Sequence, residues 1–276
     1  MSMAATFAIS FVVTTEMKKF DEIAAQLIAK QTLCDNAAQV EDLIETIITR
    51  HDGIRILSFV NAHAVMRSTR EADFFNDLMQ SHRLLRDGTG MAMIMQRAGA
   101  KSGLNLNGTD FIPCLLQQVP RSWKLALLGT QDPSLGLAAK RLRAMGFEHI
   151  STLNGFHPEK MYVKHVRREN PDLVVLAMGM PKQERIARHL AQDGQIATRN
   201  TLIVNGGAIL DFLSGGVSRA PYCMRRWGIE WLYRLLSEPR RMYPRFRDSV
   251  AFAMLSQFHS KRIRARLSQQ TKAKNP

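Results

Sequence analysis

The sequence DLVVLAMGMPKQERIARHLA, residues 172–191, contains the pattern that decides the fold. Its first half is a short, unbroken run of apolar residues, typical of a strand buried on both faces of a parallel sheet. Pro181 suits the first position of a helix, where the missing N–H of proline is not needed. The free amides of this helix, predicted from Pro181 to Ala191, favour phosphate, with Lys182 and Gln183 in its first turn. The same pattern also fits an ordinary strand-to-helix turn of an α/β domain.

Short apolar runs alternate with amphipathic stretches on both sides of this segment. Strands are predicted at Ile54–Val60, Arg83–Arg86, Lys124–Gly129, His149–Leu153, Leu173–Met178 and Thr201–Asn205. Helices are predicted between them at Arg70–Ser81, Gly90–Ala98, Asp110–Gln118, Pro133–Met145, Pro158–Glu169 and Pro181–Ala191. The alternation predicts an α/β, Rossmann-like fold, in which helices cover both faces of a mostly parallel sheet. Ligands of such folds bind beyond the carboxyl ends of the strands.

The length of 276 residues suits one α/β core with an appendage. Residues 1–50 are predicted to be a peripheral N-terminal lead-in, with a helical pattern over Val40–Thr49, and residues 51–216 the α/β core. Residues 217–267 are predicted to form a basic, amphipathic helical appendage, and residues 268–276 a disordered tail.

The net charge of +14 is concentrated near the C-terminus. From Val217 to Pro276, 14 Lys and Arg residues stand against three acidic residues, a net charge of +11, so the first 216 residues carry only +3. Apolar residues such as Trp227, Trp231 and Leu235 are interleaved with these arginines. The pattern fits a helix on an anionic membrane surface, and equally a helix packed on the core with a solvated basic face. The charge alone also permits a nucleic-acid-binding protein, but the α/β body has no RNA- or DNA-binding signature.

The other motifs limit the class of chemistry. Cys34, Cys114 and Cys223 are widely spaced and are expected to be reduced thiols. The apolar run from Phe7 to Val13 is too short to cross a bilayer, so we expect a cytoplasmic protein unless its surface binds a membrane. The sequence has no phosphate-binding P-loop, no zinc-binding His-Glu-x-x-His, no Asp-x-Asp pair and no histidine cluster, so neither a metal nor a cofactor is expected.

Polar residues and glycines stand at the predicted carboxyl ends of several strands. Asp87 follows a short strand and opens a tight turn with Gly88 and Gly90, which suits a general base, although Asp-Gly is also a common turn dipeptide. Asn61 follows another strand, where it could orient a hydroxyl group or cap a turn. Further candidates at such positions are Asn107, Gly129, Gly179 and Asn205.

A set of short segments gives the chain a specific signature. They are Asn61-Ala62, Asp87-Gly88-Thr89-Gly90, Asn107-Gly108-Thr109-Asp110-Phe111, Leu128-Gly129 with Pro133, Asn154-Gly155, Pro171-Asp172-Leu173, Gly179-Met180-Pro181-Lys182-Gln183-Glu184, Asp211-Phe212-Leu213-Ser214-Gly215, Arg219-Ala220-Pro221, Gly228-Ile229-Glu230-Trp231-Leu232-Tyr233-Arg234-Leu235 and Glu238-Pro239-Arg240-Arg241. Together they resemble the WecG/TagA/CpsF family, glycosyltransferase family 26, over about residues 54–250.

The resemblance implies an inverting, metal-independent glycosyltransferase of bacterial cell-surface or exopolysaccharide synthesis. Such an enzyme moves a sugar from a UDP-sugar donor to a polyprenyl-diphosphate-linked saccharide while bound peripherally to the anionic inner face of the cell membrane. Family donors are UDP-N-acetylmannosamine, UDP-N-acetylmannosaminuronic acid and UDP-glucose. Residues 51–216 would be the catalytic core, with no nucleic-acid partner. Two questions stay open, namely whether copies of the chain form a homo-oligomer and whether the chain is an inactive scaffold, although Asp87 and Gln183 are both in place.

The resemblance also implies roles for single residues. Asp87 would deprotonate the acceptor hydroxyl, and Gln183 would lie in the donor pocket. Arg234 and Arg241 would reach the diphosphate from the appendage, where charge-assisted contacts suit a leaving group that has no metal. The other positions carried over to the donor or acceptor site are Asn61, Gly88, Gly90, Asn107, Gly129, Gly179, Pro181, Lys182, Glu184 and Asn205.

The chain departs from the family pattern at two positions. Phe59 stands where relatives often carry Thr, which removes a hydroxyl contact to the sugar. Pro244 stands where a third appendage arginine is expected, with Arg245 next to it.

Overall fold

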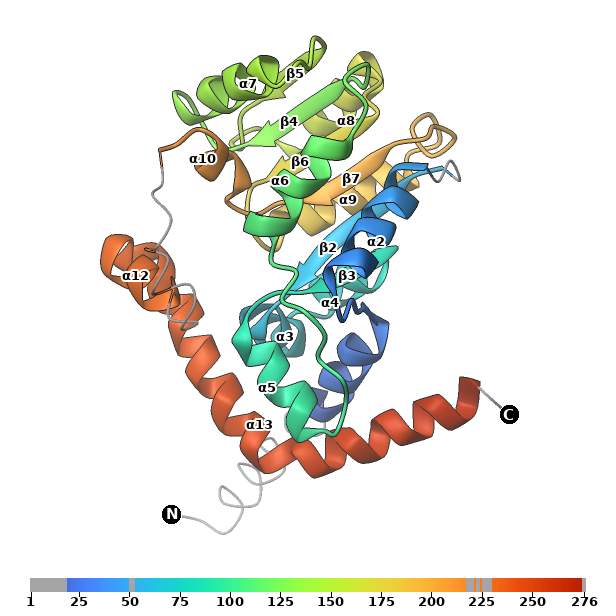
Figure 1. The fold of residues 1–276 in the computed structure, drawn as a ribbon, viewed down its shortest axis with the longest axis vertical. Helices are drawn as coiled ribbons and strands as arrows, with labels where there is room; N and C mark the ends of the chain where they lie inside the picture. The colour runs from blue at the N-terminus through green and yellow to red at the C-terminus, as the bar shows by residue number, and fades with distance from the viewer. Residues whose placement is uncertain (1–18, 50–52, 217–220, 222–223, 225–229, 275–276) are drawn as a thin grey trace.

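Seven parallel strands form a single sheet in the order β1-β3-β2-β7-β6-β4-β5 (Figure 1). The computed structural model describes residues 19–49, 53–216, 221, 224 and 230–274. The strands are β1 Gln31–Thr32, β2 Arg55–Val60, β3 Arg83–Arg86, β4 Leu125–Gly129, β5 Ile150–Leu153, β6 Leu173–Ala177 and β7 Leu202–Asn205. The predicted α/β, Rossmann-like sheet is confirmed.

Helices connect the strands and continue beyond the last one. They are α2 Ala37–Thr49, α3 Ala62–Arg70, α4 Ala72–Met79, α5 Thr89–Arg97, α6 Gly108–Gln118, α7 Ser134–Ala144, α8 Glu159–Glu169, α9 Lys182–Gln192, α10 Ile209–Leu213, α12 Glu230–Ser237 and α13 Pro239–Lys274, and residues 19–30 are also helical. The predicted core helices recur with ends shifted by at most two residues.

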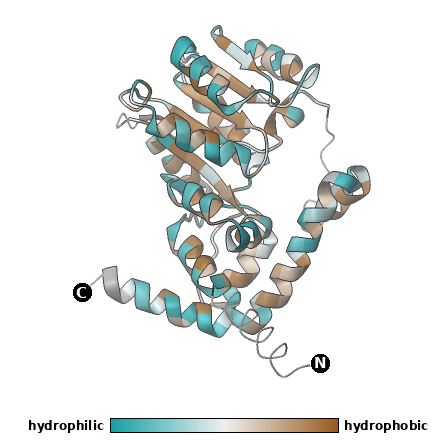
Figure 2. Cartoon of the chain, turned by 180° about the vertical axis from the view of Figure 1, so that it is seen from behind, coloured by the Kyte–Doolittle hydropathy of each residue, from teal (hydrophilic) through white to brown (hydrophobic). Residues whose placement is uncertain are grey.

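The sheet is covered on both faces because successive strand side chains point in opposite directions. On one face, Leu127 of β4 and Val175 of β6 belong to a buried cluster with residues of α2, α6, α7 and α10. On the other face, Leu128 and Val174 pack with residues of α8 and α9. Figure 2 shows the resulting layers, with the strands largely brown between helices that alternate teal and brown. Burial on both faces explains why the strands read as unbroken apolar runs.

A third buried cluster joins the two ends of the described chain. It unites the helix at residues 19–30 with α3, α4, α5 and α13. Phe252 of α13 is fully buried, and its ring centroid lies 6.0 Å from that of Phe20 in an edge-to-face contact. Asp21 Oδ1 and His259 Nδ1 lie 2.6 Å apart in the same region. Residues 19–30 and α13 therefore share one core.

The strand order creates a topological switch point between β4 and β6, and we call the region beyond the carboxyl ends of these two strands the crevice. The chain leaves β4 toward the outer strand β5, whereas it leaves β6 toward β7 on the other side. Ligands of open α/β sheets bind at such a switch point, beyond the carboxyl ends of the strands. The two strands also approach closely there, because a Cβ atom on Gly129 would lie 2.2 Å from the backbone oxygen of Ala177. Only glycine fits this position.

Candidate active site

The parallel sheet gathers most of the predicted site residues along one edge. Asp87 follows β3, Asn61 follows β2, Asn205 ends β7, Gln183 follows β6 and Gly129 ends β4. Neighbouring strands lie about 4.8 Å apart, so the ends of β3 and β6, three spacings apart, are separated by about 14 Å. This edge therefore has two separate regions. We call the region of Asp87 and Asn61 the first pole, and the crevice between β4 and β6 the second pole.

Asn61 holds the carboxylate of Asp87 at the first pole. Its Nδ2 donates a hydrogen bond of 3.1 Å to Asp87 Oδ2, and its Oδ1 accepts one of 3.0 Å from the backbone N–H of Ala64. The second bond caps the N-terminus of α3, so it fixes which end of the Asn61 amide faces Asp87. Asp87 is only half-buried, and its backbone N–H donates to Val60. The result is an oriented carboxylate that solvent and ligands can reach.

The turn after Asp87 is organised by Arg86, a residue that we did not predict for the site. The buried Arg86 guanidinium donates to the backbone oxygens of Gly88, Ser102 and Gly103. Gly88 has a φ of +88°, and Gly90 lies so near Ala62 that an added Cβ would come within 3.3 Å of the Ala62 Cβ. These contacts bind the turn to the loop before α6.

Two other predicted residues have structural contacts away from the Asp87 carboxylate. Asn107 caps α6, with its Oδ1 accepting from the backbone N–H of Asp110 at 3.0 Å. Phe59, at the first departure from the family pattern, is buried with its ring centroid 6.3 Å from that of Phe111. Its side chain fills the core beneath α6.

At the second pole, Lys182 ties the loop after β5 to the start of α9. Its Nζ donates to the backbone oxygens of Gly155 at 2.8 Å and His157 at 3.1 Å, and lies 5.2 Å from the centroid of the Tyr162 ring. Partial burial lowers the pKa of Lys182. Pro181 is the residue before α9, and Gly179, with a φ of +76°, has open space around it. Beside the crevice, Gly179 therefore has no neighbour close to its Cβ position, and Lys182 tethers Gly155 to α9.

Thr130, directly after β4, contacts Asp211 of α10, a residue that the sequence signature included but assigned no role. Thr130, with a φ of +42°, donates from its Oγ1 to Asp211 Oδ1. Its backbone N–H donates to Ala177 at 3.1 Å, and its carbonyl accepts from Gly155 at 2.8 Å. Thr130 thus connects the ends of β4, β5 and β6.

Three predicted residues are buried just below the edge. Gln183 and Glu184 are 3% and 2% exposed, and Gln183 Nε2 donates to Glu184 Oε1 at 2.8 Å. Gln183 Oε1 accepts from the backbone N–H of Gly207 at 3.0 Å. Burial raises the pKa of Glu184 to about 7, although the bond from Gln183 acts in the opposite direction. Asn205 is also buried, and its Nδ2 donates to Ser58 Oγ at 2.8 Å.

Helix α13 contacts the element that carries Asn61. Asp248 of α13 lies 2.7 Å from His63 Nδ1 and accepts two hydrogen bonds from Arg70, so it joins α13 to both ends of α3. Burial lowers the pKa of His63, and the charge of the half-buried Arg245 adds to that effect. Arg234 and Arg241 lie on α12 and α13, but their side chains are outside the described part of the structure. Pro244 lies near the start of α13.

The described residues lack two features. No group of three or more His, Cys, Asp or Glu side chains has the arrangement of a metal site among them. Within the same residues, no helix combines the length and apolar character that crossing a membrane requires.

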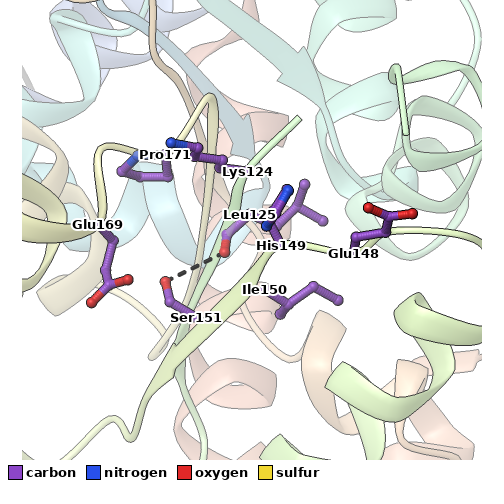
Figure 3. A pocket seen from close by; sticks show the side chains of 8 residues that line it. All are labelled: Lys124, Leu125, Glu148, His149, Ile150, Ser151, Glu169 and Pro171. Atoms are coloured by element: carbon purple, nitrogen blue, oxygen red, sulfur yellow. Dashed lines mark hydrogen bonds between the residues drawn. The ribbon is translucent and has the colours of Figure 1, made fainter. Parts of the chain in front are cut away.

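A separate hollow of about 380 Å³ lies at the opposite edge of the sheet (Figure 3). Its lining includes Lys124, Glu148 and His149 at the amino ends of β4 and β5, where Ser151 Oγ donates to the backbone oxygen of Leu125 at 3.4 Å. Because ligands of this fold bind at the carboxyl edge, the hollow is distinct from the candidate active site.

The sequence is similar to known proteins over most of its length. The model of the glycosyl transferase WecG/TagA/CpsF family matches residues 29–267. A relative from Bacillus subtilis (strain 168), named N-acetylglucosaminyldiphosphoundecaprenol N-acetyl-beta-D-mannosaminyltransferase, is 28% identical over 198 residues, which are 67% of this chain and 73% of the relative. A protein of the same name from Staphylococcus aureus (strain MW2) is 27% identical over 188 residues, 66% of this chain and 72% of that protein.

Proposed function

The chain belongs to the WecG/TagA/CpsF family of glycosyltransferases, and from this premise we propose which sugar it moves and how. We propose that it transfers N-acetylmannosamine from a UDP-linked donor to N-acetylglucosamine on a polyprenyl diphosphate, with inversion at the anomeric carbon. The names of the two relatives support this pair of sugars. The observation that carries the proposal is the Asn61–Asp87 pair at one pole of the carboxyl edge, with an open, glycine-lined crevice at the other.

The separation of the poles suits a nucleotide sugar lying along the edge. With its uridine at the crevice and its diphosphate extending past the first turn of α9, a donor would span about three strand spacings, roughly 14 Å, so that the anomeric carbon next to the diphosphate lies beside Asp87. Backbone amides at a helix N-terminus favour the negative charge of the phosphates. Arg234 and Arg241 would add positive charge from α12 and α13 when the acceptor is bound.

The chemistry then requires one base and one stabilised leaving group. Asp87 removes the proton of the acceptor hydroxyl while that oxygen attacks the anomeric carbon from the face opposite the diphosphate. The bond between the anomeric carbon and the phosphate oxygen breaks, and UDP leaves with the electron pair. Asn61 orients Asp87 through the 3.1 Å hydrogen bond.

The exposed apolar residues of α13 support the proposal that the reaction takes place at a membrane surface. Tyr243, Val250, Met254 and Phe258 recur at helical spacing and are 63%, 38%, 60% and 78% exposed. The opposite side of α13 is buried in the core. Exposed arginines and lysines flank the apolar stripe. We propose that this stripe contacts the inner face of the cell membrane, where the lipid-linked acceptor is found.

The test is a transfer assay with the purified full-length chain. UDP-N-acetylmannosamine, UDP-N-acetylmannosaminuronic acid and UDP-glucose are each offered with a synthetic polyprenyl-diphosphate-linked N-acetylglucosamine. We expect a β-linked disaccharide from the first donor, and equal rates in excess EDTA and in Mg²⁺, because backbone amides and arginines take the diphosphate charge. Product from another donor alone would correct the sugar, and loss of activity on chelation would contradict the metal-independent mechanism.

A further inference from the structure

Glu184 has an ionisable side chain in a buried position, where a charged carboxylate is unfavourable. It is 2% exposed, and its Oε2 has no hydrogen-bond partner among the described residues. The charged groups that face it are Arg67 of α3 and Asp77 of α4. Arg67 is already paired with Glu71, and Asp77 with Arg188 of α9. Burying a carboxyl group without an ion-pair partner costs several kcal/mol unless the group titrates to its neutral form.

A side-chain hydrogen bond of Glu184 leads to the crevice. Its Oε1 accepts from Gln183 Nε2, and Gln183 Oε1 in turn accepts from the backbone N–H of Gly207. A backbone N–H can only donate, so the oxygen of the Gln183 carboxamide must face Gly207 and its nitrogen must face Glu184. Both ends of this carboxamide are therefore fixed.

The turn that Gln183 holds belongs to the same edge. Gly206 donates from its backbone N–H to Leu176 of β6 at 2.7 Å, which places the turn after β7 beside the crevice. Gly207 has a φ of +62° and open space where a side chain would stand. Its conformation depends on contacts with neighbouring residues, and the bond to Gln183 is one of them.

We propose that Glu184 is a positioning residue that fixes the carboxamide of Gln183, and through it the Gly206–Gly207 turn, for binding of the nucleotide diphosphate. This inference rests on the proposed function, because it presumes that the crevice receives UDP. Glu184 itself does not contact the ligand. We expect Glu184 to affect UDP affinity only through the orientation of the Gln183 carboxamide.

A double-mutant cycle on UDP binding separates positioning from a general structural role. The proteins are the native chain, Glu184→Leu, Gln183→Ala and the double variant, with UDP affinity measured by calorimetry. A misplaced hydrogen bond in the site weakens binding by about tenfold, so we expect that loss in each single variant. We expect no further loss in the double variant, because without Gln183 there is no carboxamide left to orient.

Two more variants distinguish a loss of UDP binding from a loss of folding. Glu184→Gln retains an oxygen that accepts from Gln183, so its UDP affinity should stay within about twofold of the native value. Glu169→Leu is the matched control, because Glu169 pairs with Arg168 and lines the hollow at the opposite edge of the sheet. Its UDP affinity should also stay within about twofold, and thermal melting of every variant monitors the fold.

The outcomes distinguish this inference from the proposed function. If the native chain does not bind UDP, the proposed function fails. If it binds UDP and Glu184→Leu reduces the affinity further in the Gln183→Ala background by its full factor, Glu184 acts independently and the inference is wrong. If Glu184→Leu does not fold, the decision rests on Glu184→Gln, and a tenfold loss there at an unchanged melting temperature would also overturn it.

Discussion

At the scale of single residues, Asn61 shows how one amide links the fold to the chemistry. Its oxygen caps α3 while its nitrogen holds Asp87, so the orientation of the proposed base depends on a helix cap. Asp87→Asn keeps the size of the side chain but removes its basicity. We expect turnover to fall about 10²–10⁴-fold, with UDP affinity within about twofold of the native value. Asp172→Asn, at the amino end of β6, is the control and should keep normal turnover; a normal rate for Asp87→Asn would rule out the role as base.

Glu184 gives a second prediction at this scale, for stability. Its pKa is raised from 4.5 to about 7, so the folded state binds this proton more tightly than the unfolded state between those values. Stability from this group is therefore lost as the pH rises from about 4.5 to about 7, and it stays lost above that range. Glu184→Gln cannot ionise, so at pH 8 it should exceed the native chain in free energy of unfolding by on the order of 2–3 kcal/mol. Urea titrations at pH 5 and pH 8 measure this, and an equal difference at both pH values would contradict it.

At the scale of elements, α13 is fastened to α3 through one buried carboxylate. Burial opposes ionisation of Asp248, but hydrogen bonds from Arg70 and His63 hold its pKa below the usual value. The stability that it contributes is therefore present at neutral pH and is lost as the pH falls through that lowered pKa. Asp248→Ala should lower the free energy of unfolding by about 1–3 kcal/mol and speed proteolysis of α13.

The control for Asp248 is a more exposed ion pair at the other partner of this contact, helix α3. Arg67 and Glu71 lie 3.0 Å apart at the end of α3, with Glu71 43% exposed. Surface pairs of this spacing contribute only about 0.3–0.5 kcal/mol, so Glu71→Ala should change the unfolding curve little. Equal losses in the two variants would show that α13 is not held by Asp248.

Sequence patterns were sufficient for most elements, and the exceptions have physical causes. Buried parallel strands read as apolar runs, which made β4 and β6 predictable. Helix α3 was missed because only Val65 and Met66 of its buried residues are large and apolar, and the others, such as Ala64 and Ser68, are small. Strand β1 is only two residues long, too short for any period.

The candidate site also contains residues that the sequence could predict and contacts that it could not. Asp87 and Asn61 could be predicted because both follow strands, and parallel strands bring their ends to one edge. The chain from Glu184 through Gln183 to Gly207 could not be predicted, because it depends on β7 lying next to β6. The bond between Thr130 and Asp211 depends in addition on the close approach of α7 and α10.

At the scale of the whole molecule, charge and exposed apolar surface are combined on α13, and a binding experiment tests whether this surface contacts a membrane. Phe258→Glu removes an apolar side chain that is 78% exposed and adds a negative charge. Burying such a side chain in a membrane contributes about 1.5–3 kcal/mol, so affinity for anionic phospholipid vesicles should fall at least about tenfold.

The control is Leu137→Glu, which changes an exposed residue on α7 and should leave vesicle binding unchanged. Native binding should weaken as salt rises, and an oligonucleotide should not compete at physiological salt. If Phe258→Glu bound vesicles like the native chain, or if the oligonucleotide displaced it, the membrane contact would have to be assigned elsewhere.

The pairing of Asp21 with His259 has a consequence for how the protein is made. The two residues are 238 positions apart in the chain. A ribosome adds about 5–20 residues per second, so the helix at residues 19–30 waits on the order of ten to fifty seconds for its partner. During that interval the apolar side chains of α3 and α5 that face α13 have nothing to cover them. A nascent chain of this kind exposes the apolar surface that chaperones bind until α13 has been made.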